Sequence, residues 1–335
     1  MDDLRHYRRI FRDIILGYSE VTIKGKAYYI RHLSSLDQVE IDEIEEFHLQ
    51  KATARGIPRR KEVLEGLIKS GDWSEEKEKK IKDLERFIEQ LQKNKTQFVL
   101  KSEIDRQNKT MQETRGKINE LENEKKLLLS TDAESYASKR AQDYYIVKSY
   151  FEDEGLKKPV FPEEADYGDL YMDEVSDFVL TYNNTFEDFG ELRLQEMILQ
   201  DFYYIYFPFC DDTVGFFGNP VSRLTYNQLK LIVYTKIFKN ILENNKHIPE
   251  KIKKDPQALL DYGAIDDDAK QKMKDKLSGD KDGSTLFNAT DEDFEYAGLD
   301  KPSDSSQMSL QEAAKKKGGS LTMEDLMELS GHQVK

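Results

Sequence analysis

Residues 18–33 read YSEVTIKGKAYYIRHL, and this stretch decides the fold of the N-terminal part of the chain. If Lys24 and Gly25 are the two turn residues of a hairpin, the turn sets the register of both strands. The resulting pairs are Val21 with Tyr28, Ile23 with Lys26, and Ser19 with Ile30. Four apolar side chains then share one face: Val21, Ile23, Tyr28 and Ile30. Two strands are only marginally stable alone, so this face must pack on a helix or on another chain.

An amphipathic helix precedes the hairpin. Apolar side chains recur at spacings of three and four residues, the period of a helix with one buried face. They are Leu4, Tyr7, Phe11 and Ile14. Arginines fall between them, at positions 5, 8, 9 and 12. This arginine face either contacts an anionic partner surface or is simply solvated.

A second helix is predicted after the hairpin. Ser35 and Gln38 have the spacing of a capping box, which indicates a helix over about residues 36–54. Its candidate inward side chains are Val39, Ile44 and Phe47. The segment RGIPRR ends this helix, and a shorter helix that begins at Pro58 ends at Gly71.

Residues 72–154 have the composition of long surface helices, with no proline and a single glycine, Gly116. The apolar residues up to 98 follow one heptad phase, and those from 104 follow another that is displaced by two residues. One straight helix would carry its apolar seam onto a different face at that break. We therefore predict an antiparallel coiled-coil arm, with helices over about residues 74–96 and 101–129. The arm either projects as a spacer or folds back on the rest of the chain.

A third helix is predicted from a further capping-box pair, Thr131 and Glu134. Its apolar seam consists of Ala137, Ala141, Tyr144, Val147 and Phe151. The next segment, GLKKPVFPEEADYGD, has the composition of a linker.

The following region is acidic and aromatic. Residues 160–213 contain fourteen Asp or Glu and one basic residue, Arg193, within a chain of net charge -14. Such a surface repels phosphates and attracts basic partners. We therefore expect no nucleic-acid partner and favour proteins with basic surfaces. Helices are predicted over residues 169–184 and 186–207, and the capping-box pair of Thr225 and Gln228 begins another.

The segment GFFGNPVSRLT, residues 215–225, is predicted to form a corner between two helices. Its glycines supply backbone freedom and its Asn-Pro pair ends the first helix. Phe216 and Phe217 either fill the core of their own domain or stand out as an anchor for a partner. Both are candidate partner-binding residues.

The chain beyond Ser278 is rich in Gly, Ser, Asp and Lys and is predicted to be a flexible tail. It contains one apolar island, SLTMEDLMELSG, which predicts a short helix that docks on a partner or on its own chain. The candidate contact residues of this helix are Leu321, Met323, Leu326, Met327 and Leu329.

Motifs of common catalytic and cofactor sites were sought in the sequence. Glycine-rich phosphate loops, dinucleotide fingerprints and nucleophile elbows are not present, and the histidines show no ligand spacing. Cys210 is the single cysteine and is interpreted as a core residue. We therefore expect no enzyme activity, no catalytic residues, no cofactor and no metal. No apolar run approaches the roughly 20 residues that span a bilayer, so no membrane partner is expected.

Two segments, VTIKGKAYYIRHLS and FPFCDDTVGFFGNPVSRLTYNQLKLIVY, resemble parts of tail-assembly chaperones and baseplate-hub proteins of large tailed bacteriophages. The resemblance covers about residues 14–50 and 195–245. It implies a non-enzymatic role in building a tail or baseplate, with tail or baseplate components as partners. It also implies a location in the host cytoplasm during assembly or in the virion. Self-association is an open alternative.

The expected fold is mainly α and elongated, with a small N-terminal β-hairpin module, an antiparallel coiled-coil arm and a C-terminal helical domain. The domain boundaries are residues 1–71 for the hairpin and its helices, 72–154 for the arm, 155–277 for the acidic aromatic domain and 278–335 for the tail. The alternative function is that of a coiled-coil adaptor, which recruits a regulatory or replication partner through its acidic domain and C-terminal peptide.

Overall fold

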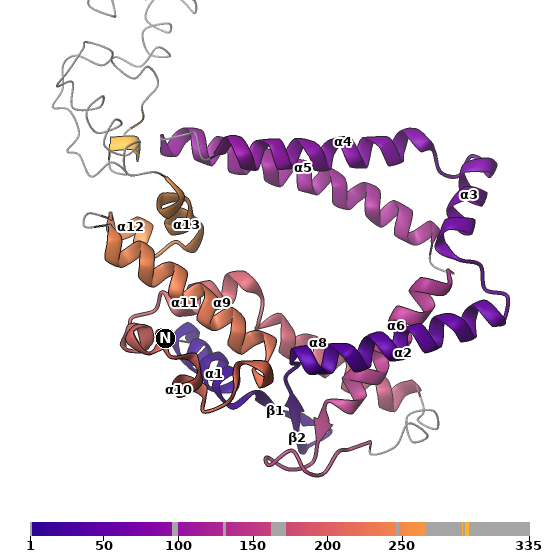
Figure 1. Ribbon diagram of the computed structural model, residues 1–335, viewed down its shortest axis with the longest axis horizontal. Coiled ribbons are helices and arrows are strands. Elements are labelled where there is room, and N and C mark those ends of the chain that lie inside the picture. The colour runs from indigo at the N-terminus through magenta and orange to yellow at the C-terminus, as the bar shows by residue number, and fades with distance from the viewer. Residues whose placement is uncertain are drawn as a thin grey trace, which may run out of the picture. The chain divides into compact units, whose positions relative to one another are not determined.

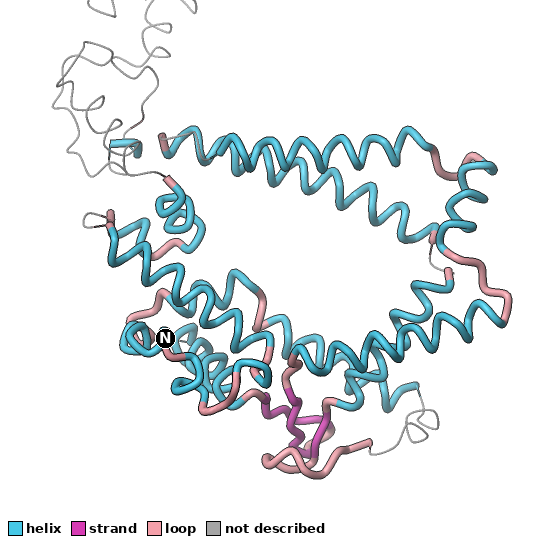
Figure 2. Tube along the Cα trace, viewed as in Figure 1, coloured by secondary structure: helices cyan, strands magenta, loops and turns pink. Residues whose placement is uncertain are grey.

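The computed structural model describes residues 2–95, 100–129, 132–161, 172–245, 248–265, 290 and 292–294. These residues are mainly helical, with one small antiparallel sheet (Figure 1), as the sequence predicted. The α-helices are α1 (Asp2–Leu16), α2 (Ser35–Ala54), α3 (Arg60–Ser70), α4 (Glu75–Lys95), α5 (Lys101–Leu128), α6 (Ala133–Lys148), α8 (Met172–Glu187), α9 (Glu191–Ile198), α10 (Thr213–Phe217), α11 (Tyr226–Asn244), α12 (Glu250–Lys253) and α13 (Pro256–Ala264). The structure also has two 3₁₀ helices, η1 (Tyr204–Asp211) and η2 (Val221–Arg223), and three strands, β1 (Tyr18–Ile23), β2 (Lys26–Arg31) and β3 (Tyr150–Phe151) (Figure 2).

The chain divides into two compact units. The first comprises residues 1–82, 118–244 and 254–256, and the second comprises residues 83–117, 245–253 and 257–335. Within the second unit, the carboxylate of Asp261 joins three helices. It accepts hydrogen bonds from Asn108 of α5 at 2.9 Å and from Gln257 of α13 at 2.8 Å, and it forms an ion pair with Lys95 of α4.

The hairpin in the first unit has the predicted register. Val21 pairs with Tyr28, Ile23 with Lys26, and Ser19 with Ile30. Lys24 and Gly25 both have positive φ, 48° and 81°, as a two-residue turn of this handedness requires. The apolar face packs in a core cluster that contains Ile23, Ile30, Ile146, Tyr150 and Tyr182, so helices α6 and α8 cover it.

A third strand was not predicted. Phe151, which the sequence assigned to a helical seam, pairs with Tyr29 of β2 instead, because α6 ends at Lys148. The neighbouring Tyr150 is fully buried, and its hydroxyl donates to the backbone carbonyl of Phe178 at 2.7 Å. This extra pairing ties the end of α6 to the hairpin and to α8.

Helices α2 and α6 lie side by side (Figure 1) and make the most extensive contact between two elements of this unit. The predicted caps of both were misplaced by one residue. The N-cap of α2 is Ser34, whose backbone N–H donates to Asp37 at 2.7 Å. The N-cap of α6 is Asp132, which accepts from the backbone N–H of Ser135 at 2.6 Å.

The predicted inward positions of α2 were also partly wrong. Val39 and Phe47 are exposed, and α2 buries Asp37, His48 and Ala52 instead. The sequence favoured the large apolar residues as core positions. In the structure, α2 packs extensively against α6, and the small Ala52 is fully buried while the larger Val39 and Phe47 are not.

The predicted capping box of α11 is confirmed and has a second role. The Gln228 side chain accepts from the Thr225 backbone N–H at 3.0 Å. Its amide nitrogen also donates to the carbonyls of Ile14 at 3.0 Å and Ile15 at 3.2 Å, near the end of α1. The backbone N–H of Tyr226 donates to Leu33 at 2.8 Å. The start of α11 is thereby joined to both ends of the hairpin module.

The two long helices have the predicted ranges within one or two residues. Near the start of α4 and the end of α5, Lys77 pairs with Glu124 and Glu78 pairs with Lys125. These pairs show that the two helices run antiparallel here. The buried apolar residues of α4 and α5 include Ile81, Leu91, Ile104, Met111 and Ile118, all from the predicted seams.

Candidate functional site

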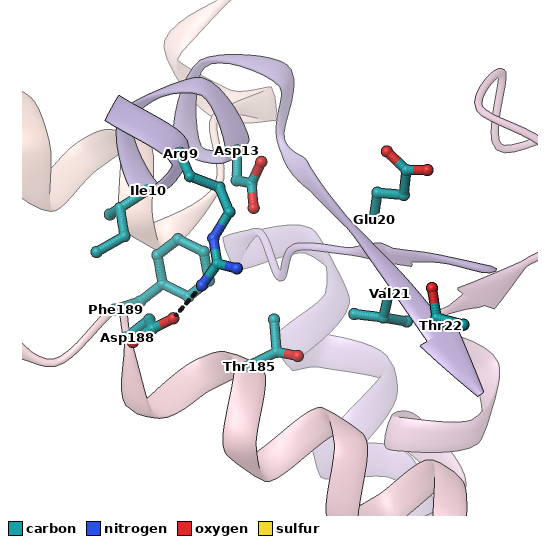
Figure 3. Close-up of a pocket in the computed structure, with 9 residues that line it drawn as sticks. All are labelled: Arg9, Ile10, Asp13, Glu20, Val21, Thr22, Thr185, Asp188 and Phe189. Atoms are coloured by element: carbon teal, nitrogen blue, oxygen red, sulfur yellow. Dashed lines mark hydrogen bonds and ion pairs between the residues drawn. The ribbon is translucent and has the colours of Figure 1, made fainter. Parts of the chain in front are cut away.

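The first candidate site is a polar pocket in the first unit, with a volume of about 370 Å³. Figure 3 shows it between α1, strand β1 and the segment that follows α8. Its lining consists of Arg9, Ile10, Asp13, Glu20, Val21, Thr22, Thr185, Asp188 and Phe189. The Arg9 guanidinium donates to Asp188 at 2.9 Å, and His6 lies 3.0 Å from the other oxygen of the same carboxylate. An ion pair therefore bridges one side of the pocket, and Glu20 adds an exposed carboxylate to the lining.

A buried polar row lies behind this pocket. Ser19 Oγ lies 2.9 Å from His32 Nε2, and both residues are only 1% exposed. Burial lowers the pKa of His32 to about 3, because the charged imidazolium loses its hydration between the rings of Phe186 and Phe189. Burial also raises the pKa of Asp13, while hydrogen bonds from Arg12 and Ser19 oppose this effect.

The order of this row differs from that of a catalytic triad. In a triad, the imidazole lies between the serine and the carboxylate and takes the serine proton. Here Ser19 lies between the carboxylate of Asp13 and the imidazole of His32, and its hydroxyl is closed to solvent. The row is not arranged for nucleophilic attack, and it leaves His32 Nδ1 buried without a hydrogen-bond partner among the described residues.

The single cysteine occupies a core position, as predicted. Cys210 is 1% exposed, and burial raises the pKa of its thiol. The neutral thiol is a poor nucleophile. No group of metal-ligating side chains was found among the residues that the structure describes, and none of its described helices is both long and apolar enough to cross a bilayer.

The second candidate site is the corner around Phe216 and Phe217. Both rings are half-buried and pack edge to face with centroids 4.8 Å apart. Phe216 also contacts Tyr206, which packs against Phe11 of α1 at 4.7 Å. The pair therefore closes the edge of the aromatic core and keeps part of each ring at the surface.

More exposed apolar side chains lie within 12 residues of this pair along the chain, and sequence reasoning missed them. They are Ile205, Phe209, Val214 and Val221, between 51% and 67% exposed, and we call them the corner patch. The helix predicted over residues 186–207 breaks after α8 and again after α9, so that η1 carries Ile205 and Phe209. A 3₁₀ helix has three residues per turn, so the 3.6-residue period used for prediction could not place them.

The other candidate contact residues, Leu321, Met323, Leu326, Met327 and Leu329, lie outside the described residues.

Comparisons of the chain with protein-family models, with curated proteins and with solved structures gave no match.

The corner is held by a cap that requires Gly215. Asp212 accepts from the Gly215 backbone N–H at 2.9 Å, and a Cβ atom at position 215 would lie 2.3 Å from the Asp212 carboxylate. Gly215→Ala should therefore displace the cap and, relative to a Gly→Ala change at a free helical position, lower the free energy of unfolding by about 1 kcal/mol, measured by urea denaturation. Gly66→Ala in α3 is the control, since no atom lies within 4 Å of its Cβ position. This control should raise stability by about 0.5–1 kcal/mol, and equal effects of the two variants would contradict the cap.

Proposed function

We propose that this protein is a non-enzymatic assembly protein that acts by binding other proteins. The observation that carries the proposal is the corner patch, which exposes four large apolar side chains within 17 residues, from Ile205 to Val221. Contiguous apolar surface is unfavourable in water and commonly marks a protein interaction site. Half-buried Phe216 and Phe217 add aromatic surface at the same corner.

The charges near the corner favour a basic partner. Asp211 forms an ion pair with Lys239, whereas Asp212 is exposed and caps α10. The surrounding sequence, residues 160–213, contains one basic residue against fourteen acidic ones. An apolar patch that follows such an acidic stretch favours a partner that has apolar anchors and basic residues around them.

The setting that we propose is the tail or baseplate of a large tailed bacteriophage, and it rests on the sequence resemblance of residues 14–50 and 195–245. The partners would be tail or baseplate components. The alternative is a coiled-coil adaptor for a regulatory or replication partner, and the antiparallel contact of α4 with α5 favours this alternative.

The proposal is tested by photocrosslinking in the cells that naturally produce the protein. A photoreactive residue replaces Phe209 in the corner patch, and a second variant carries it at Leu127 of α5, which is 78% exposed. We expect crosslinks from position 209 to structural tail or baseplate proteins and none of these from position 127. Crosslinks from position 209 to replication proteins would favour the adaptor instead, and identical products from both positions would contradict a specific corner site.

A further inference from the structure

Helix α2 has a second apolar surface that its own fold does not use. The buried residues of α2 are Asp37, His48 and Ala52, and α6 is the element with which α2 makes its most extensive contact. Leu36, Val39 and Phe47 are 60%, 58% and 54% exposed. At 100° per residue, these three positions lie on the side of the helix opposite the buried stripe. The sequence pattern that predicted Val39 and Phe47 as core residues therefore describes a face that is open to solvent.

This outer face is an open, shallow surface rather than an enclosed cleft. It is formed by Val39, Asp42, Glu43, Glu46, Phe47 and Gln50. Apolar side chains form part of it, and carboxylates and one amide form the rest. All of these residues belong to α2, so the surface lies on one helix.

The charges of α2 are neutralised on one side only. Residues 36–50 contain six Asp or Glu and no Lys or Arg. Toward the body of the unit, Asp37 pairs with Arg31 at 2.9 Å and Glu40 pairs with Lys148. On the outer face, Asp42 and Glu46 accept hydrogen bonds only from Gln38 and Gln50. Among the described residues, no cation forms an ion pair with the three outer carboxylates, Asp42, Glu43 and Glu46.

This arrangement of exposed carboxylates and apolar side chains is energetically unfavourable while the face of α2 is in contact with water. Like charges spaced three or four residues apart repel one another on a helix, and exposed apolar side chains keep water ordered around them. One cation of the chain already contacts this face: Lys51 Nζ lies 5.5 Å from the centroid of the Phe47 ring, in a cation–π interaction. A partner that brought cations and an apolar stripe together would relieve both unfavourable terms.

We propose that the outer face of α2 binds a basic amphipathic helix of a partner protein. The partner presents an apolar stripe to Leu36, Val39 and Phe47, and its lysines or arginines pair with Asp42, Glu43 and Glu46. The face from residue 36 to residue 50 is about 21 Å long, which matches about four turns of the partner helix. This surface would give the protein a docking surface on α2 in addition to the corner patch, whose element η2 contacts α2.

The test uses a synthetic helical peptide of about 15 residues, with a leucine stripe flanked by lysine and arginine. A second peptide keeps the stripe and replaces the basic residues by glutamate. Binding to the full chain is measured by fluorescence anisotropy at about 50 and 300 mM NaCl. We expect the basic peptide to bind, the acidic peptide not to bind, and the affinity for the basic peptide to fall at the higher salt concentration.

Matched variants distinguish this site from general attraction to an acidic protein. Phe47→Ser and the double variant Glu43→Lys with Glu46→Lys should each weaken binding of the basic peptide by about tenfold or more. The controls are Leu180→Ser, an exposed apolar position on α8, and Glu85→Lys with Glu89→Lys on α4. The controls should change the affinity by less than about threefold.

Three outcomes would overturn the proposal. The first is no binding of the basic peptide, or equal loss in the α4 charge-reversal control. The second is a dimer of the wild-type chain that Phe47→Ser dissociates in analytical ultracentrifugation, which would identify a second copy as the occupant. The third is binding of the basic peptide that appears only after residues 278–335 are deleted, which would identify the chain's own C-terminal segment as the occupant.

Discussion

Gln228→Ala is expected to lower the free energy of unfolding of the first unit by about 3 kcal/mol. The side chain is 5% exposed and makes three hydrogen bonds, to the Thr225 N–H and to the carbonyls of Ile14 and Ile15. Its removal takes the side-chain partner from the Thr225 N–H and from the Ile15 carbonyl, while the Ile14 carbonyl still accepts from the Gly17 N–H at 3.2 Å. It also removes the side-chain hydrogen bonds that join α11 to α1. Trp73, the single tryptophan, is buried in the same unit, so its fluorescence in urea reports the unfolding.

Two further variants test the physical reason. Gln228→Glu keeps an acceptor for Thr225 and replaces the donor by a carboxylate that faces two carbonyls, so it should be as destabilising as alanine. Gln38→Ala removes an exposed glutamine that makes one surface hydrogen bond, to Asp42, and should change stability by less than about 0.5 kcal/mol. A loss for Gln228→Ala no greater than that for Gln38→Ala would show that the tie contributes little.

The stability of the first unit is expected to fall by about 2 kcal/mol between pH 7 and pH 5 because of His32 alone. Burial lowers the pKa of His32 from 6.5 to about 3 in the folded chain. In the unfolded chain, the His32 imidazole therefore binds a proton below about pH 6.5. In the folded chain, the same imidazole stays neutral until about pH 3. The stabilisation is fully present above the unfolded pKa and is lost progressively as the pH falls toward 3.

The contribution of His32 is isolated by comparing pH profiles rather than single stabilities. His32→Asn removes the imidazole. Between pH 7 and pH 5, the unfolding free energy of this variant should therefore fall by about 2 kcal/mol less than that of the wild type. Phe189→Leu is the control, because it loosens the same core while the imidazole remains. Its profile should stay nearly parallel to that of the wild type. Parallel profiles for wild type and His32→Asn would show that the imidazole is not held neutral.

The hairpin and the long helices were predictable because their signals are local. The Lys24-Gly25 turn sets the strand register through backbone geometry alone, and the structure has that register. The absence of proline and the density of helix-favouring residues in residues 72–129 similarly predicted α4 and α5 within one or two residues. The box of Thr225 and Gln228 was also recognisable, because both of its bonds span three residues.

The errors occurred where distant segments decide the outcome. Phe151 was predicted to be helical, but it forms a strand because the edge of β2 offers backbone hydrogen bonds to it. Val39 and Phe47 were assigned to the core because they are large and apolar, yet α6 packs against the opposite side of α2. The corner patch was missed because η1 follows a three-residue period and its exposure depends on how α11 and α10 cover it.

The sequence by itself determined the hairpin and the long helices, where the acidic charge accumulates, and how the turn at residues 24–25 aligns two strands. These features depend on backbone preferences and on contacts within a few residues. Only the tertiary structure decided which apolar faces are covered, because the packed helices bury some of the apolar side chains and leave others exposed. That surplus is what leaves the corner patch and the outer face of α2 in contact with solvent, and both proposals rest on it.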